Sequence, residues 1–115
     1  MNNMFYFFEK LKSINISNFI TTKVLDMRSM FRDCKILSSL NISSHFDTSQ
    51  VIDMSYMFSG CENIGSFNLI NFNTSRVNIM NYKFNNCSLL TSLDLLSFDI
   101  RNVKEMNNMF SNCTK

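Results

Sequence analysis

Hydrophobic and polar positions recur along the whole chain with a step of 26 or 27 residues. Each cycle holds a methionine, a Met-Phe pair and a cysteine, as in the stretch DMSYMFSGC at 53–61, except that the first cycle has Phe8 in place of the cysteine. In one cycle Lys83-Phe84 replaces the Met-Phe pair. The cysteines mark the period most clearly, at Cys34, Cys61, Cys87 and Cys113. Self-similarity at a fixed period of this length predicts a repeat protein.

The period divides the 115 residues into four units and a partial fifth. Their bounds are 1–26, 27–53, 54–79 and 80–105, followed by 106–115, and the second unit carries one extra residue within 43–45. A chain of this length holds one domain. Repeat arrays normally carry capping ends, and this sequence shows none, so we expect a single domain that is a fragment of a longer array.

Within a unit the hydrophobic period changes. Met54, Met57, Phe58 and Cys61 follow an i, i+3, i+4, i+7 spacing, which predicts one face of a short helix. An acid such as Asp53 directly before this face is expected to cap the helix. Triplets such as 40–42 alternate apolar and polar residues, which predicts a short strand, and polar corners such as FDTSQV follow them.

These elements predict the fold class. We expect an α/β repeat, a leucine-rich-repeat-like right-handed solenoid with one short parallel strand and one short helix per 26-residue coil. The methionine, phenylalanine and cysteine of each unit are expected to point inward and to stack on their counterparts. Stability would then come from the contacts between neighbouring units, because one unit cannot bury its apolar face alone.

Two units carry a family likeness in their spacing, cysteine and polar corner. VLDMRSMFRDCKILSSLNISSHFDTSQV at 24–51 and VIDMSYMFSGCENIGSFNLINFNTSRV at 51–77 resemble the repeats of BspA-like leucine-rich-repeat surface proteins, a type also seen in mycoplasma lipoprotein-associated sequences. The resemblance implies a solenoid at the cell surface or outside the cell, with a role in adhesion or partner binding. It implies no catalytic residues.

Composition and charge narrow the class of partner. The net charge of +2, from 11 basic and 9 acidic residues spread along the chain, is too weak and diffuse for nucleic-acid binding. No apolar stretch is long enough for a membrane helix, so we expect no direct membrane insertion. Glu9, Lys10 and Lys12 interrupt the N-terminal region where a signal peptide would be apolar. A cytoplasmic location therefore stays open beside the surface location that the resemblance implies.

The cysteines invite chemical hypotheses. A zinc site usually needs a short pair of ligands, whereas these cysteines are 26 or 27 residues apart and His45 lies in another part of the cycle. A reactive thiolate needs a neighbouring base or cation, and four copies of one cysteine do not build a single active site. We therefore predict a buried cysteine column, no enzyme activity, no metal and no cofactor. Disulfides between neighbouring units are a less favoured alternative, since parallel side chains seldom give the required dihedral angle.

The candidate partner-binding face is the outward side of the predicted sheet. Alternation along each strand places two columns of polar residues opposite the apolar ones. We call them the serine row and the Asn/Asp row, and they consist of Ser13, Ser39, Ser66 and Ser92, and of Asn15, Asn41, Asn68 and Asp94. A solvated sheet face with no ligand is the competing interpretation.

The functional prediction follows from this face. We expect a non-catalytic repeat module for protein binding or cell-surface adhesion, whose partner is a protein or an extended surface ligand. The alternative is a structural spacer or intracellular scaffold segment with no ligand of its own. Uncapped ends would also favour end-to-end association of one copy of the chain with another.

Overall fold

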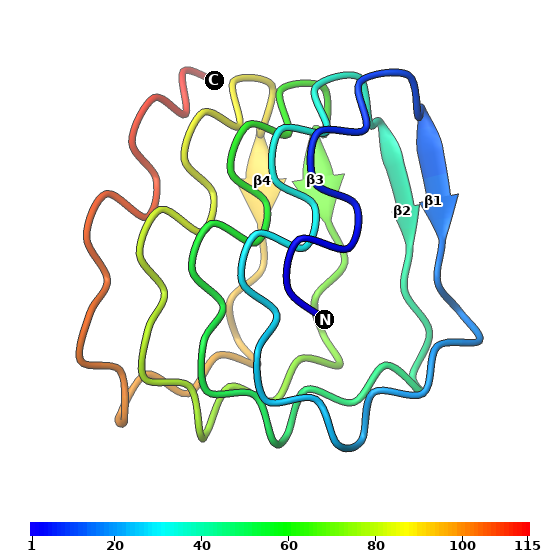
Figure 1. The fold of residues 1–115 in the computed structure, drawn as a ribbon. Helices are drawn as coiled ribbons and strands as arrows, with labels where there is room; N and C mark the ends of the chain where they lie inside the picture. The colour runs from blue at the N-terminus through cyan, green and yellow to red at the C-terminus, as the bar shows by residue number, and fades with distance from the viewer.

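Four short strands, one in each complete unit, run in parallel in the computed structural model, which describes residues 1–115 (Figure 1). Their bounds are β1 (Ser13–Asn15), β2 (Ser39–Asn41), β3 (Ser66–Phe67) and β4 (Ser92–Leu93). Strand β1 pairs with β2 and β3 pairs with β4, with Ser13 opposite Ser39 and Ser66 opposite Ser92. Each strand therefore overlaps one of the alternating triplets but begins one residue before it, and paired residues are one repeat apart.

The predicted fold class is nevertheless wrong. The leucine-rich-repeat-like right-handed solenoid required one helix per coil and one parallel sheet along the molecule, but the structure has no helix and its strands form two separate two-stranded sheets. Most of the chain lies in turns and irregular backbone, within a compact body of 30 × 30 × 23 Å. With no helix present, no helical segment of the structure is long and apolar enough to cross a membrane.

Runs of tight turns replace the predicted helices. Each run consists of four-residue turns, in which the N–H of the fourth residue donates to the carbonyl of the first. An example is the N–H of Met30, which donates to the carbonyl of Met27 at 3.3 Å. The third residue of such a turn has a positive φ, 55° at Ser29 and 58° at Asp33. A positive φ at every fourth residue is incompatible with a right-handed helix. We call these runs the turn segments, and they comprise residues 1–8, 27–34, 54–61, 80–87 and 106–113.

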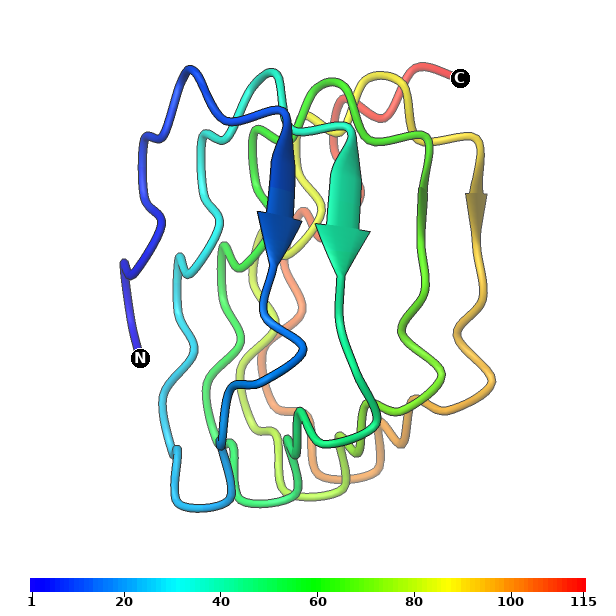
Figure 2. The same ribbon diagram turned by 90° about the vertical axis from the view of Figure 1, so that its right-hand side faces the viewer.

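Every second N–H of a turn segment donates to the next unit. Ser29 donates to the carbonyl of Ser55 and Phe31 to that of Met57, both at 2.9 Å. The same pattern continues from unit to unit as far as the last turn segment. Because half of the N–H groups leave the segment, the i−4 bonds of an α-helix cannot form. The turn segments instead lie side by side across the molecule, from the N-terminal to the C-terminal unit (Figures 1 and 2).

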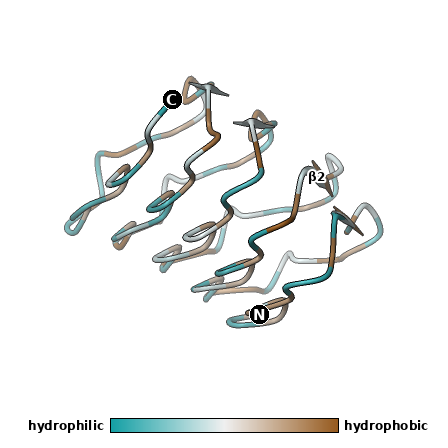
Figure 3. Cartoon of the chain, turned by 90° about the horizontal axis from the view of Figure 1, so that it is seen from above, coloured by the Kyte–Doolittle hydropathy of each residue, from teal (hydrophilic) through white to brown (hydrophobic).

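The core lies between the turn segments and the strands. Met54, Met57, Phe58 and Cys61 are fully buried, so the predicted inward columns are confirmed although the helix is not. The rings of one phenylalanine per unit stack with centroids 5.4–5.6 Å apart, and we call this the phenylalanine column: Phe5, Phe31, Phe58, Phe84 and Phe110. Figure 3 shows the units side by side, with hydrophobic and hydrophilic stretches alternating along each.

Asp and Asn side chains turn the chain in place of proline, which is absent, and glycine, which occurs twice. Asp47 accepts a hydrogen bond from the N–H of Ser49 at 2.8 Å. Asp53 likewise accepts from the N–H of Ser55 at 2.8 Å, and the predicted role of Asp53 as a helix cap is wrong because no helix follows it. These are Asx turns, in which a side-chain oxygen substitutes for a backbone acceptor.

One interface between units lacks strand pairing. No backbone hydrogen bond joins β2 and the residues around it to β3 and its surroundings, whereas the turn segments of the same two units stay bonded. The extra residue within 43–45 lies beyond the end of β2, between this strand and the next turn segment.

Candidate functional site

The two polar rows lie on the outward side of the strands, as the alternation predicted. In β1, Ser13 and Asn15 are exposed while Ile14 between them is buried. All eight residues of the two rows are exposed. Neighbouring strands in a paired sheet are about 4.7–4.9 Å apart, so the paired members present hydrogen-bonding groups at that spacing.

The rows are divided into two patches. Asn15 lies opposite Asn41 in the first sheet, and Ser66 lies opposite Ser92 in the second. Between β2 and β3 there is no pairing. The structure therefore brings the candidate residues together in pairs of neighbouring units and does not join them into one ladder of four.

Three members of the Asn/Asp row have an intramolecular partner. The side-chain oxygens of Asn15, Asn68 and Asp94 accept the N–H two residues on, at 2.9, 3.4 and 2.8 Å. Asn41 makes no such bond, and its amide is free to meet a partner. Part of the row thus shapes the corner that follows each strand, and sequence reasoning missed this role although Asn and Asp are common turn formers.

The cysteines form a column of free thiols. Each thiol donates to the backbone carbonyl of a phenylalanine in the preceding unit, with Cys61 Sγ 3.2 Å from the carbonyl of Phe31. Burial raises the pKa of Cys34 to about 11 and that of Cys87 to about 12. Burial also raises the pKa of Cys61 well above its ordinary value. A thiol with a raised pKa is a poor nucleophile, so this column packs and donates hydrogen bonds.

Lys83 occupies the column in which other units place a methionine. Its side chain is fully buried, with Nζ 3.1 Å from the sulfur of Met54. Three rings surround the amine, at 4.4 Å from the ring centre of Phe98, 5.2 Å from Phe72 and 5.6 Å from Phe84. Burial lowers the pKa of Lys83 to about 7. The sequence showed the substitution, but the period alone could not show that the lysine keeps the buried position.

The family described as "Mycoplasma protein of unknown function, DUF285" matches residues 1–115. The chain belongs to this mycoplasma family. No curated protein and no solved structure matches the chain. The family description gives no activity, so membership fixes no substrate, ligand or partner.

This DUF285 chain also carries an aromatic and cationic ladder on its turn segments, which sequence reasoning missed. The guanidinium of Arg32 lies 5.7 Å from the ring centre of Tyr6 and 4.8 Å from that of Tyr56. Tyr56 in turn stacks on Tyr82, with ring centroids 4.9 Å apart. Cation–π and stacked contacts of this kind stabilise neighbours without a continuous sheet. Arg32 is not the counterpart of the later tyrosines in the repeat, so no single column predicted the ladder.

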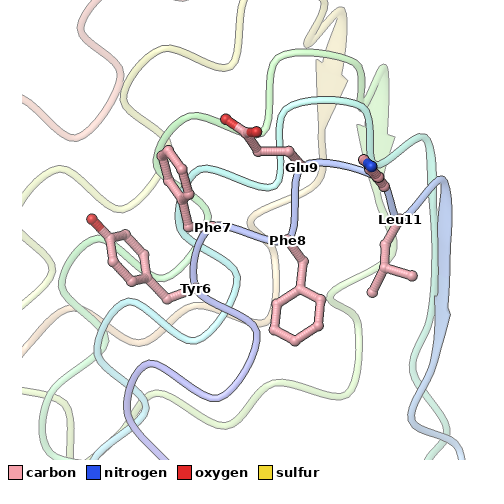
Figure 4. Close-up of a pocket in the computed structure, with 6 residues that line it drawn as sticks. Tyr6, Phe7, Phe8, Glu9 and Leu11 are labelled. Carbon is pink, nitrogen blue, oxygen red and sulfur yellow. The ribbon is translucent and has the colours of Figure 1, made fainter.

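The same turn-segment face of this DUF285 chain begins in an open hollow at the first unit. The hollow has a volume of about 420 Å³ and is lined by residues 6–11 (Figure 4). Phe7 and Phe8 are roughly half exposed there, at 53% and 45%. The hollow is lined mostly by hydrophobic side chains and contains no cluster of metal-ligating residues. Its chemistry is that of an apolar contact surface.

Proposed function

We propose that this chain is a non-catalytic binding module, whose serine row and Asn/Asp row contact a protein or an extended surface ligand. The observation that supports the proposal is the exposure of all eight row residues, six of which lie opposite one another in pairs one repeat apart. A partner in extended conformation has its own donors and acceptors at a regular spacing, so it can match such pairs. The likeness of the units to those of BspA-like surface proteins supports a cell-surface or extracellular location and a role in adhesion.

Asn41 is the residue on which we expect the binding to depend most. Its amide makes no side-chain hydrogen bond within the molecule, so it can bond a ligand without breaking a turn. Its row neighbours Asn15 and Asp94 keep one oxygen engaged with the backbone and offer their remaining groups. The proposed ligand is therefore held by several weak polar contacts, each worth about 1 kcal/mol.

The spacer function is a second candidate, and the turn-forming bonds of Asn15, Asn68 and Asp94 favour it. In that case the exposed rows serve to shape the corners and to keep the surface solvated. The two functions make opposite predictions for a chain in which the row side chains are shortened.

The test uses extended peptides selected from a random display library against the 115-residue chain. The variant Asn41→Ala/Asn68→Ala/Asp94→Ala is compared with the wild type by fluorescence anisotropy of the labelled peptides. A matched control, Thr22→Ala/Lys23→Ala/Asn63→Ala, changes three exposed residues outside the rows. Thermal unfolding checks that both variants are folded.

The binding proposal predicts that the row variant loses at least about tenfold in affinity, which corresponds to ~1.4 kcal/mol, while the control binds as the wild type does. If the library yields no binder, or if the row variant binds every selected peptide unchanged, the binding function is wrong and the spacer function replaces it.

A further inference from the structure

Arg32 lies in the second turn segment, and its guanidinium is held between tyrosine rings of the two neighbouring units. The guanidinium carbon is 5.7 Å from the ring centre of Tyr6 in the first unit and 4.8 Å from that of Tyr56 in the third. Tyr56 is itself stacked on Tyr82 of the fourth unit. Contacts from both neighbours limit the rotation of this planar cation, so its N–H groups are oriented before any ligand arrives.

The terminal nitrogens of Arg32 have no partner within the molecule. Nε is buried, lies 3.3 Å from a carboxylate oxygen of Asp33 and makes no hydrogen bond. Nη1 and Nη2 make no hydrogen bond either, but they are not buried, and 39% of the side-chain surface is exposed. The other three arginines each have an acidic or amide partner: Arg28 pairs with Asp26 and Asp53, Arg76 with Gln50 and Arg101 with Asp99. Arg32 is therefore the one arginine whose terminal donors are both oriented and free.

Tyrosine hydroxyls add further polar groups beside this guanidinium. The hydroxyls of Tyr6 and Tyr56 make no hydrogen bond within the molecule, whereas that of Tyr82 accepts one from the amide of Asn108 at 3.0 Å. Tyr6 is 44% exposed, and Tyr56 and Tyr82 are partly exposed. Arginine and tyrosine are the residue types enriched among those that contribute most to protein interfaces. The composition of this surface is therefore typical of a contact with another protein.

The charges around Arg32 determine which anion it can bind. Asp33 is the one carboxylate that pairs with Arg32, and it offsets part of the positive charge. The second charge of a phosphate ester therefore adds less attraction here than it would at an arginine without an acidic neighbour. A carboxylate carries a single charge, and its two oxygens fit the two terminal nitrogens of a guanidinium in one plane. The site thus favours a carboxylate.

We propose that Arg32, with the rings of Tyr6 and Tyr56, binds a glutamate or aspartate side chain of an acidic peptide segment in a protein partner. Nη1 and Nη2 donate to the two oxygens of the carboxylate, and the rest of the segment lies against the exposed parts of the tyrosine rings. This surface lies on the turn segments, across the core from the serine row and the Asn/Asp row. It therefore does not depend on the function proposed for those rows.

The test is an NMR titration of the 115-residue chain with a blocked peptide of alternating glutamate and serine residues. Two further peptides carry glutamine or phosphoserine at the glutamate positions. Arg32→Gln removes the charge, and Arg32→Lys keeps the charge but lacks the planar pair of terminal donors. Arg76→Gln is the matched control, because it removes the same charge from an exposed arginine outside the turn segments. Thermal unfolding checks that each variant is folded, and the comparison of the three peptides on the wild type needs no variant.

The glutamate peptide is expected to bind the wild type and to shift the backbone amide signals around Arg32 and Tyr56. The glutamine peptide is expected to cause no such shift, and the phosphoserine peptide is expected to bind no more tightly than the glutamate peptide. Both Arg32 variants should bind the glutamate peptide at least about tenfold more weakly, whereas Arg76→Gln should bind it as the wild type does.

Four outcomes overturn the proposal. The first is a wild type that does not bind the glutamate peptide up to the solubility limit of the peptide. The second is an equal loss of affinity in Arg76→Gln and Arg32→Gln, because that result requires only diffuse positive charge. The third is unchanged binding by Arg32→Lys, which excludes the paired donors. The fourth is a phosphoserine peptide that binds about tenfold more tightly than the glutamate peptide, which makes the site one for phosphate.

Discussion

Each unit has a turn segment on one side and a strand on the other, and we call the strands with the residues next to them the strand side. The two sides hold neighbouring units together differently. The turn segments are bonded at every interface, and one ring per unit stacks through all five of them. The strand side has two or three residues per strand and no pairing between β2 and β3. The turn segments, rather than the strands, therefore hold neighbouring units together.

The two sides differ because they form different numbers of backbone hydrogen bonds between units. A turn segment sends every second N–H to its neighbour and closes its own turns with the others, so both sets are bonded. A strand of two residues offers very few ladder bonds, and one extra residue within 43–45 accompanies the loss of those between β2 and β3. Substitutions on the turn segments should therefore cost more than comparable ones on the strand side.

The largest effect is expected at Lys83, the basic group buried inside the turn-segment core. Between pH 7 and 10.5 the unfolded chain holds a proton on this amine that the folded chain has released, so the contribution of Lys83 to stability rises with pH. The buried cysteines act in the opposite direction, because their raised pKa values remove stability at alkaline pH.

The variant Lys83→Met isolates the lysine, since the cysteines are common to both proteins. Urea denaturation should find the variant more stable than the wild type at pH 7. That advantage should shrink by about 3–4 kcal/mol at pH 10, within the ~5 kcal/mol that the shift of this pKa allows. Lys35→Met, at an exposed position, is the control and should show no such change. An advantage of Lys83→Met that is independent of pH would contradict the account.

The next effect compares one core residue from each side. Phe58 is fully buried and stacks on Phe31 and Phe84, so Phe58→Ala should lower the free energy of unfolding by about 3–5 kcal/mol. Leu40 in β2 is only partly buried beside the unpaired interface, and Leu40→Ala should cost roughly 1–2 kcal/mol. Equal costs in urea denaturation would mean that the two sides hold the array equally.

The two glycines provide a smaller, backbone-level comparison. Gly60 has a φ of +74°, and a Cβ there would meet the side chain of Asp33 and lie 3.2 Å from its Cα. Gly60→Ala should therefore destabilise the protein by about 2 kcal/mol or more. A Cβ at Gly65, near β3, would meet only the carbonyl of Leu89 at 3.8 Å, and Gly65→Ala should change stability by less than about 1 kcal/mol. Thermal unfolding of the two variants distinguishes these values.

The smallest effect lies within the Asn/Asp row. Asn15→Ala removes the bond to the N–H of Ser17 and should cost about 0.5–1.5 kcal/mol. Asn41→Ala removes no intramolecular side-chain bond and should leave the free energy of unfolding within about 0.5 kcal/mol of the wild type. If Asn41→Ala is the more costly of the two, the assignment of a free amide at this position is wrong.

The period of the sequence was sufficient to predict which residues are buried and which face outward. Phe58, Cys61 and Ile14 are inside and Asn41 is outside, because burial repeats with the unit whatever the local conformation. The conformation itself was not predictable from that spacing. Two consecutive tight turns, offset by four residues, place residues i, i+3, i+4 and i+7 on one face. Two turns of an α-helix place the same residues on one face, so this spacing fits either conformation.

The information that separates turns from helix was present but weak. Each turn segment has two positions with a positive φ. One of them is occupied by Asp33, Gly60 and Asn86 in successive units, and all three residue types tolerate that conformation. Tyr56 and Tyr82 sit at the other, where aromatic residues concealed the pattern. The break between β2 and β3 and the burial of Lys83 depend on contacts between units, which no single unit reveals.

Amide hydrogen exchange tests the central claim most directly, because it measures each backbone bond separately. The account predicts that the amides of Phe31 and Phe58, which donate between turn segments, exchange slowly. The amides of Ile42 and Leu69, which meet no backbone acceptor on the strand side, are predicted to exchange much faster. Protection of Ile42 and Leu69 equal to that of Phe31 and Phe58 would show that a continuous sheet holds the units, and would contradict the account.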